Sequence, residues 1–504
     1  MQQQGFDNEL YLKEQSEYII ERAKLFGSKL YLEFGGKLVH DFHAARILPG
    51  FHPNAKIRLL ERLRDSAEIL ICVYAGDIER RKTRADFGTT YDLDVLRLID
   101  DLTRREILVR AVVVTRYDGQ TSADAFIRRL ERNGIRVYLH RAIRGYPAEV
   151  ARIVSADGYG ANPFVETERE VVVVTGPGPG SGKMATCLSQ VYHEHLRGVR
   201  AGYAKFETFP IWNLPLKHPV NVAYEAATAD LGDFNQVDPF HLEAYGSVAI
   251  NYNRDVEIFP VVKHILRRIM GDERVYKSPT DMGVNRAGFA IRDDRVVQNA
   301  AVQEVIRRYF RYQCEYKMGL TEQTTVDRVS VLMAELGCAE TDRSVVLPAR
   351  QAAEQAREQG RGHDGIFCGA AIELPDGRLV TGKNSALLHA ASAGVLNAIK
   401  ELAGIPDAIH LLSGLVLQSV GEMKTKILKG GQVSLNLDET LIALSVSAAA
   451  NPMAQAALQQ LERLRGCEMH LTHIPTPGDE SGLRRLGVNL TCDPNFSSKF
   501  LHAV

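Results

Sequence analysis

The sequence lacks the features that would cross-link the chain or coat it with charge of one sign. Its seven cysteines are odd in number and widely separated, which is typical of reduced thiols in the cytosol rather than of a disulfide framework. Lysine and arginine total 61 and aspartate and glutamate total 62, so there is no basic field to attract nucleic acid. We therefore expect neither a disulfide-rich secreted protein nor a nucleic-acid partner.

Long apolar runs are also missing. The longest, at residues 441–450, is too short to span a membrane and is followed by Asn451 and Pro452. Residues 1–20 contain no basic segment followed by an apolar run, which argues against a signal or transit peptide. We expect a cytoplasmic protein with no membrane partner.

What the chain does contain is material for several hydrophobic cores, since 504 residues exceed what one core usually supports. We predict an α/β domain over 1–252, a mostly helical connecting region over 253–340 and a smaller α/β domain over 341–504. From residue 29 to residue 206, short β-branched runs alternate with helical patterns, as in a parallel sheet covered on both faces. The predicted fold class is therefore α/β, with a doubly wound, mainly parallel sheet whose ligands collect at the carboxyl ends of its strands.

The strongest chemical feature is a loop of alternating glycine and proline at residues 176–183. It follows a β-branched run and ends in Lys183, where a helical pattern begins. Such a loop directs free backbone N–H groups and the positive end of a helix at one point, which favours a phosphate group. The residues predicted to hold the phosphate are Gly176, Gly178, Gly180, Ser181, Gly182, Lys183 and Thr186.

The loop departs at two positions from the common pattern G-x-x-x-x-G-K-[ST]. Pro177 stands in place of the first glycine, and Met184 in place of the hydroxyl residue that binds Mg²⁺. Thr186 lies two positions further on, about 200° around the helix, so it is an imperfect substitute. We expect ATP or another phosphorylated small molecule as the ligand, while Met184 argues against Mg²⁺. The alternative is a Gly/Pro turn that only connects a strand to a helix.

A charge-rich stretch at 205–255 follows the strand expected after this loop. Lys205 and Glu207 lie where that strand ends, so we predict that they face the loop and act in catalysis. The alternative is a solvated, salt-bridged surface. A second basic run follows another strand and supplies further candidates for binding a phosphate or a carboxylate. These are Arg80, Arg81 and Arg84.

Two groups of residues have the spacing of metal ligands, but their setting argues against a metal site. Cys467, His470 and His473 lie in a predicted strand, where alternation places His470 on the face opposite the other two. The second group is formed by His40, His43 and His52. We expect no metal, and in particular no zinc, at either place.

Counted from Gly176, the loop reads G-x-x-x-x-x-G-K, and its continuation GKMATCLSQVYHEHLRGVRAGYAKFETF resembles the start of the dethiobiotin synthetase family of ATP-dependent ligases. The resemblance implies phosphate binding, with Lys205 matching a lysine that faces the phosphates in that family. In that family the phosphate loop opens the chain, whereas here several βα units precede it. We therefore take the resemblance as an argument for phosphate binding and not for the ligase reaction.

Over nearly its whole length, through segments such as KFETFPIWNLPLKHPVN and YKSPTDMGVN, the chain resembles a bacterial family catalogued as a domain of unknown function. Some members of that family are labelled ATP-dependent peptidases. The sequence contains neither the H-E-x-x-H pattern of zinc proteases nor the G-x-S-x-G turn of serine hydrolases.

The segment 369–404 resembles the strand, turn, strand and helix core of the cytidine deaminase fold. We predict a β-hairpin that turns at Pro375–Gly377 and a helix packed on it. Deaminases need a Cys or His followed by Glu and a later C-x-x-C, but His389 is followed by two alanines and the chain has no C-x-x-C. The resemblance implies a zinc-free domain for binding or assembly, and we expect a homo-oligomer.

Two functional hypotheses remain open. The first is an enzyme that binds a nucleotide or another phosphorylated molecule at residues 176–183 and performs ligase or phosphoryl-transfer chemistry. The second is a non-catalytic, oligomeric ligand-binding or regulatory protein. Met184 favours the second hypothesis, because phosphoryl transfer depends on a bound metal ion.

Overall fold

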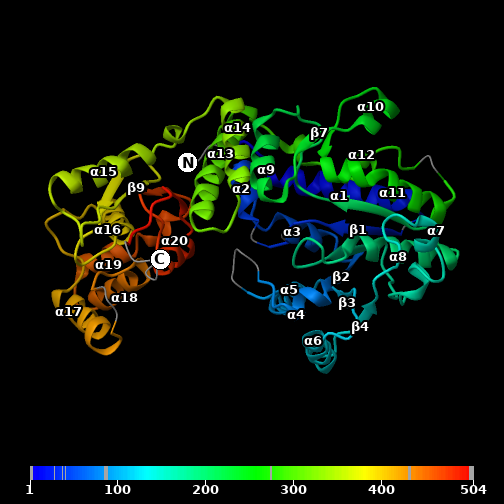
Figure 1. Ribbon diagram of the computed structural model, residues 1–504, viewed down its shortest axis with the longest axis horizontal. Helices are drawn as coiled ribbons and strands as arrows, with labels where there is room; N and C mark the ends of the chain where they lie inside the picture. The colour runs from blue at the N-terminus through cyan, green and yellow to red at the C-terminus, as the bar shows by residue number, and fades with distance from the viewer. Residues whose placement is uncertain are drawn as a thin grey trace. The chain divides into compact units, whose positions relative to one another are not determined.

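The computed structural model describes residues 4–27, 29–36, 38–39, 41–83, 89–272, 275–429 and 433–498. The chain divides into two compact units, Gln2–Ala301 and Val302–Val504 (Figure 1). Helix α13 (Asp294–Lys317) begins in the first unit and continues into the second.

The N-terminal unit is built on a parallel sheet with the strand order β4-β3-β2-β5-β1-β6. Every residue of β1 and of β5 is buried, because helices cover both faces of the sheet. The predicted doubly wound α/β fold is confirmed. The strands are β1 (Leu30–Phe34), β2 (Ala67–Tyr74), β3 (Val109–Thr115), β4 (Val137–His140), β5 (Val171–Thr175) and β6 (Gly202–Phe206).

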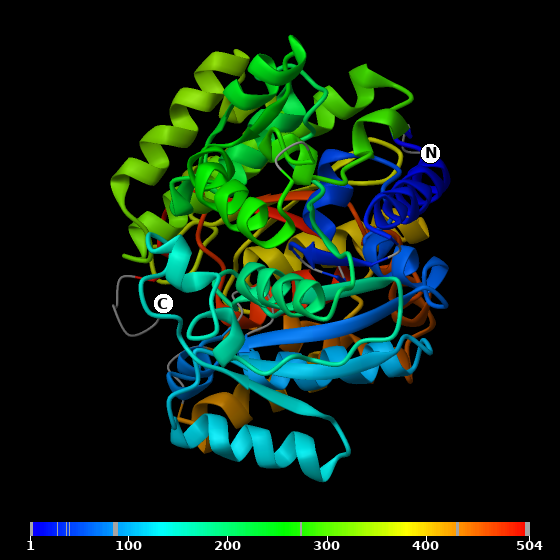
Figure 2. The same cartoon turned by 90° about the vertical axis from the view of Figure 1, so that its right-hand side faces the viewer.

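The helices lie on opposite faces of this sheet because the connections run in opposite directions. The chain moves from β2 outward to β4 through α5 (Tyr91–Thr103) and α6 (Thr121–Arg132), whereas α8 (Lys183–Leu196) leads from β5 the other way to β6. Parallel crossovers are right-handed, so α8 packs on the face opposite α5 and α6 (Figure 2). The strand order therefore reverses between β2 and β5, which is where open α/β sheets form a ligand crevice.

Further helices of the N-terminal unit surround the sheet. Helix α11 packs on the outside of α8, and α1 packs on α3. These helices are α1 (Asn8–Leu25), α2 (Phe42–Ile47), α3 (Ala55–Arg62), α4 (Ala75–Glu79), α7 (Val150–Ile153), α9 (Pro219–Ala227), α10 (Pro239–Tyr245), α11 (Asn253–Met270) and α12 (Pro279–Met282).

The loop-rich segment 207–252 is ordered by polar contacts with residues 276–285. The Asn285 side chain donates to the carbonyl of Thr208 at 2.8 Å, and the Trp212 indole donates to the carbonyl of Asn285 at 3.0 Å. A short antiparallel pair, β7 (Asn235–Val237) and β8 (Ile250–Tyr252), lies within the segment. The two sequence segments quoted above for the family resemblance are thus packed against each other beside β6.

The C-terminal unit contains a mixed sheet with the order β10-β9-β11-β12. Strands β9 (Gly369–Glu373) and β10 (Leu379–Lys383) pair antiparallel through a turn in which Gly377 has φ 85°. Helix α16 (Ala390–Ala403) packs on this hairpin, so the predicted hairpin and helix are confirmed. The other elements are β11 (Glu468–Leu471), β12 (Asn489–Cys492), α14 (Gln323–Leu336), α15 (Val346–Glu358), α17 (Gly414–Glu422), α18 (Leu437–Ala448), α19 (Pro452–Leu458) and α20 (Pro477–Leu486).

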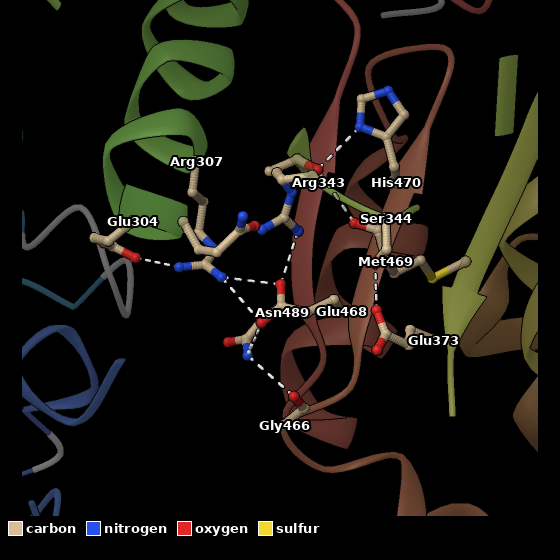
Figure 3. Close-up of polar contacts among 12 residues, drawn as sticks. Glu304, Arg307, Arg343, Ser344, Glu373, Gly466, Glu468, Met469, His470 and Asn489 are labelled. Carbon is tan, nitrogen blue, oxygen red and sulfur yellow. Dashed lines mark hydrogen bonds and ion pairs between the residues drawn. The ribbon is translucent and has the colours of Figure 1, made fainter. Parts of the chain in front are cut away.

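A network of ion pairs joins α13 to the sheet of the C-terminal unit (Figure 3). Glu468 on β11 accepts from Arg307 at 2.9 Å and from Arg343 at 2.7 Å, and Arg307 also pairs with the buried Glu304. Burial alone would raise the pKa of the Glu468 carboxyl, but the two guanidinium groups hold it below its ordinary value. The network is therefore a partly buried structural feature whose charges compensate one another.

Candidate functional site

The glycine-rich loop lies between β5, which ends at Thr175, and α8, which begins at Lys183, as the sequence predicts. Gly182 has φ 93°, a conformation that side chains rarely adopt, and a Cβ there would come within 2.8 Å of Thr115. A Cβ at Gly178 would come within 2.3 Å of the Tyr91 hydroxyl. These glycines let the loop pass close to the ends of neighbouring elements.

Neighbouring side chains donate hydrogen bonds to carbonyl groups of the loop, whereas several of its backbone N–H groups stay free. Thr115 donates its hydroxyl to the Ser181 carbonyl at 2.8 Å, and Arg116 donates to the Gly180 carbonyl. Within the described part of the chain, the N–H groups of Gly178, Gly180 and Gly182 have no hydrogen-bond partner, and no side chain caps α8. The donors at this helix N-terminus are thus exposed to a ligand.

Lys183 folds back over the same loop. Its ammonium lies 3.4 Å from the Gly178 carbonyl and 3.5 Å from the Ser181 hydroxyl. No carboxylate of the described residues pairs with it, and the side chain is only half-buried. A positive charge and free N–H groups therefore point to one place without an anionic partner in the chain.

Arg116 is a basic neighbour of this loop that the sequence analysis missed. It follows β3 directly, is exposed, and stacks its guanidinium over the ring of Tyr74 with 3.5 Å between Cζ and the ring centroid. Its position directly after the carboxyl end of a predicted strand is the feature that could have indicated it.

The basic run predicted as a secondary candidate is Arg80, Arg81 and Arg84. Arg80 pairs with Asp77. Arg84 lies outside the described residues.

Thr186 lies on the first turn of α8 but is turned toward the sheet. It is buried, and its hydroxyl accepts a hydrogen bond from the Cys72 thiol of β2 at 3.4 Å. Burial raises the pKa of that thiol to about 12, so the thiol keeps its proton. Thr186 was considered as a substitute for the hydroxyl residue missing at Met184, but its hydroxyl is already bonded to Cys72.

Lys205 lies near the end of β6 and Glu207 follows that strand directly, on the same carboxyl edge of the sheet as the loop. Strand β1 separates β6 from β5, so the two strand axes lie about 10 Å apart. The Lys205 ammonium contacts both oxygens of Asp255, at 2.7 and 2.8 Å, and Glu207 at 3.2 Å. The structure thus places Lys205 among carboxylates, and within the described residues it makes no hydrogen bond or ion pair with the loop.

The carboxylates around Lys205 alter each other's protonation. Burial, with the charges of Asp255 and Glu33 nearby, raises the pKa of Glu207 to about 7, although Lys205 opposes the shift. Burial lowers the pKa of Lys205, but the charges of Asp255 and Glu207 outweigh it and raise that pKa above its ordinary value. The sequence analysis did not predict that Glu33 belongs to this cluster. A carboxylate inside an apolar strand was the feature that could have indicated it. A carboxyl group that titrates near neutral pH is able to exchange protons there.

The histidine and cysteine groups with metal-like spacing are engaged in other contacts. His470 is buried, bonds through Nδ1 to Thr491 at 2.9 Å and lies 3.4 Å from Asp493. His43 packs against Phe209 and Tyr224, and His40 lies outside the described residues. Among the residues that the structure describes, no three of the usual ligand types are grouped closely enough to hold a metal ion.

No helix in the described ranges is both long and apolar enough to cross a membrane. The protein is of the α/β class. One unit contains a doubly wound parallel sheet, and the second unit contains a mixed sheet.

The family models place this protein among known sequences. The family described as domain of unknown function DUF1846, N-terminal, matches residues 4–337, and the corresponding C-terminal domain matches residues 341–502. The chain therefore belongs to the DUF1846 family, which confirms the resemblance found over its whole length. The local resemblances to dethiobiotin synthetase and to cytidine deaminase stay predictions.

Similar proteins are found in clostridia. A UPF0371 protein of Clostridium botulinum (strain Alaska E43 / Type E3) is 55% identical over 498 residues, which cover 99% of each chain. A UPF0371 protein of Clostridium tetani (strain Massachusetts / E88) is 54% identical over the same length and coverage. The similarity therefore includes both units of the chain.

Proposed function

We propose that this protein binds a phosphorylated small molecule at residues 176–183. The observation that carries the proposal is a set of free N–H groups, at Gly178, Gly180 and Gly182, beside a Lys183 ammonium that no carboxylate of the described residues neutralises. A cation at a helix N-terminus is electrostatically unfavourable, so an anion bound there relieves the repulsion. The place of the loop at the point where the strand order reverses also supports a ligand site.

The ligand class follows from the donors. Backbone N–H groups, an ammonium and the neighbouring Arg116 guanidinium all donate hydrogen bonds, which suits the oxygen atoms of a phosphate group. A nucleotide such as ATP carries these oxygens, and so does a phosphorylated metabolite. The cluster of Lys205, Glu207 and Asp255 on the same edge supports a further, catalytic step of ligase or phosphoryl-transfer type.

One observation favours a second candidate function, that of a non-catalytic binding or regulatory protein. Met184 offers no oxygen to Mg²⁺, and the Thr186 hydroxyl is buried against Cys72. Metal-dependent phosphoryl transfer needs such a ligand. Release of phosphate from ATP, measured with and without Mg²⁺, distinguishes the two functions.

The test of binding compares the wild type with Lys183→Ala, with Lys13→Ala on the exposed side of α1 as the matched control. Isothermal titration calorimetry with ATP, AMP and inorganic phosphate measures the affinity of each protein. A charge-assisted contact contributes about 1.5–3 kcal/mol, so we expect Lys183→Ala to lose about ten- to a hundredfold in affinity.

The thermal stability of the same variants completes the test. Without ligand, Lys183→Ala is expected to melt at the wild-type temperature or slightly above it, because an unfavourable charge at the start of α8 has been removed. A variant that melts several degrees lower and keeps its ligand-induced shift would show that the lysine is structural. In that case the phosphate site is rejected.

A further inference from the structure

The C-terminal unit contains a cavity of about 80 Å³ that the phosphate-binding proposal does not involve. It lies where β9, α16 and α20 begin. A polar group that enters it is partly removed from water, which strengthens hydrogen bonds and charge interactions there. The polar side chains that line it include His363, Cys368, Ser385, His389, His473 and Asp479.

Asp479 is a buried carboxylate at the edge of this cavity, and it is held by three donors. It accepts from the backbone N–H of Leu437 at 2.9 Å, from the Thr476 hydroxyl at 2.7 Å and from His389 Nδ1 at 2.7 Å. An ionised carboxylate only accepts hydrogen bonds, so the shared hydrogen is on Nδ1 of His389. Asp479 also lies in the first turn of α20, where the helix dipole favours a negative charge.

The contact with Asp479 leaves the other ring nitrogen of His389, Nε2, outside that hydrogen bond. With the hydrogen fixed on Nδ1, neutral imidazole has an unprotonated Nε2. Within the described residues, Nε2 has no hydrogen-bond partner, and His389 lines the cavity. A carboxylate that orients a histidine in this way also stabilises the imidazolium that forms when Nε2 takes a proton.

Hydrogen-bond donors lie beside this base. His389 is the N-cap of α16, and no side chain caps that helix. Ala390 and Ala391, its first residues, line the same cavity. The positive end of α16 is therefore available to a carbonyl oxygen that becomes negatively charged.

We propose that this cavity is a hydrolytic site for small acyl compounds, in which His389 is the general base, Asp479 is its positioning residue and water is the nucleophile. His389 Nε2 takes a proton from water while the water oxygen bonds to the acyl carbon. The carbonyl oxygen becomes anionic beside the N–H groups of Ala390 and Ala391. When the carbonyl re-forms, the bond to the leaving group breaks, and the imidazolium returns its proton to that group.

Water rather than a side chain is assigned as the nucleophile. Burial, with the charge of Asp479 nearby, raises the pKa of the Cys368 thiol to about 12, so little thiolate exists at neutral pH. The Ser385 hydroxyl already accepts from the N–H groups of Leu387 and Leu388, each at 3.2 Å. Metal-activated water finds no support among the described residues, since no three ligands are grouped there.

The test is hydrolysis of p-nitrophenyl acetate by the full-length protein. His389→Gln keeps a side chain able to donate to Asp479 but lacks the base, and His410→Gln, at an exposed position of the same unit, is the matched control. General-base catalysis contributes about 10²–10⁴-fold, so we expect His389→Gln to lose at least about a hundredfold in rate. The control is expected to keep the wild-type rate. A folded His389→Gln that hydrolyses the ester as fast as the wild type overturns the proposal.

A second measurement does not depend on the folding of a variant. Diethyl pyrocarbonate acylates unprotonated imidazole, and mass spectrometry identifies the modified histidine in the wild-type protein. Loss of hydrolysis in step with modification of His389 supports the proposal, whereas hydrolysis that persists after His389 is fully modified overturns it. The role of Asp479 is read from ¹⁵N spectra of labelled histidine, in which Asp479→Asn is expected to shift His389 away from the tautomer protonated on Nδ1.

Discussion

Glu207 shows how the tertiary structure changes the chemistry of a single residue. In the fold its carboxyl has a pKa of about 7, against an ordinary value of 4.5. Between these two values, the folded chain holds more protons than the unfolded chain does. The stabilising contribution of the protonated form is therefore complete below pH 4.5 and is lost as the pH rises through 7.

We expect Glu207→Gln to be more stable relative to the wild type at pH 8 than at pH 5, by a few degrees in melting temperature. The physical reason is that the amide has no charge at either pH, whereas the wild-type carboxyl is charged only at the higher one. Differential scanning calorimetry at both pH values measures the difference. Glu17→Gln, on the exposed face of α1, serves as the control. An equal difference at the two pH values would contradict the assigned pKa.

The residues of the site differ in how far the sequence could predict them. Lys205 and Glu207 were found because they end a strand, which is a local signal. The contact of Lys205 with Asp255, which is 50 residues away, depends on how α11 packs and has no local signal. Arg116 also follows the end of a strand, but its contact with the loop has no local signal, because only the sheet brings β3 close to the loop after β5.

At the scale of secondary-structure elements, the ion pairs of Glu468 connect α13 to β11 (Figure 3). We expect Glu468→Gln to destabilise the C-terminal unit by about 3–5 kcal/mol, because Arg343, which is 1% exposed, loses its carboxylate partner. Urea unfolding followed by circular dichroism measures the loss, with the exposed Glu422→Gln on α17 as the control.

The same network predicts a dependence on pH. Since the fold lowers the pKa of Glu468 from 4.5, the contribution is present above that value and is lost as the pH falls below it. The stability difference between Glu468→Gln and the wild type is therefore expected to shrink in acid. A variant as stable as the wild type at neutral pH would show that the network contributes no net stability.

The elements that the sequence predicted well have signals within a few residues. Alternating β-branched residues, glycine and proline placed β5, the loop and α8, and a Pro-Asp-Gly triplet placed the hairpin of β9 and β10. The His389–Asp479 pair had no such signal. It joins residues 90 positions apart in the chain, from the starts of two helices.

At the scale of the whole molecule, we expect a homo-oligomer in solution. Apolar side chains are exposed on α17 and α18, where Leu415 is 79% and Ile442 is 67% exposed, and monomers rarely expose large apolar patches. Size-exclusion chromatography with light scattering is expected to give a multiple of 55.9 kDa. Ile442→Glu is expected to lower that mass, and Leu196→Glu, exposed on α8, is the control. A wild-type mass of 55.9 kDa would contradict the expectation.

The sequence by itself determined the α/β class, the strand–loop–helix at residues 176–183 and the hairpin of the C-terminal unit, because periodicity and turn residues act over short distances. Only the tertiary structure decided the order of the strands. It inserts β5 between β2 and β1, which brings Thr115 and Arg116 to the loop and turns Thr186 toward Cys72. Strand order depends on packing between segments far apart in the chain, and a local sequence pattern does not encode that packing.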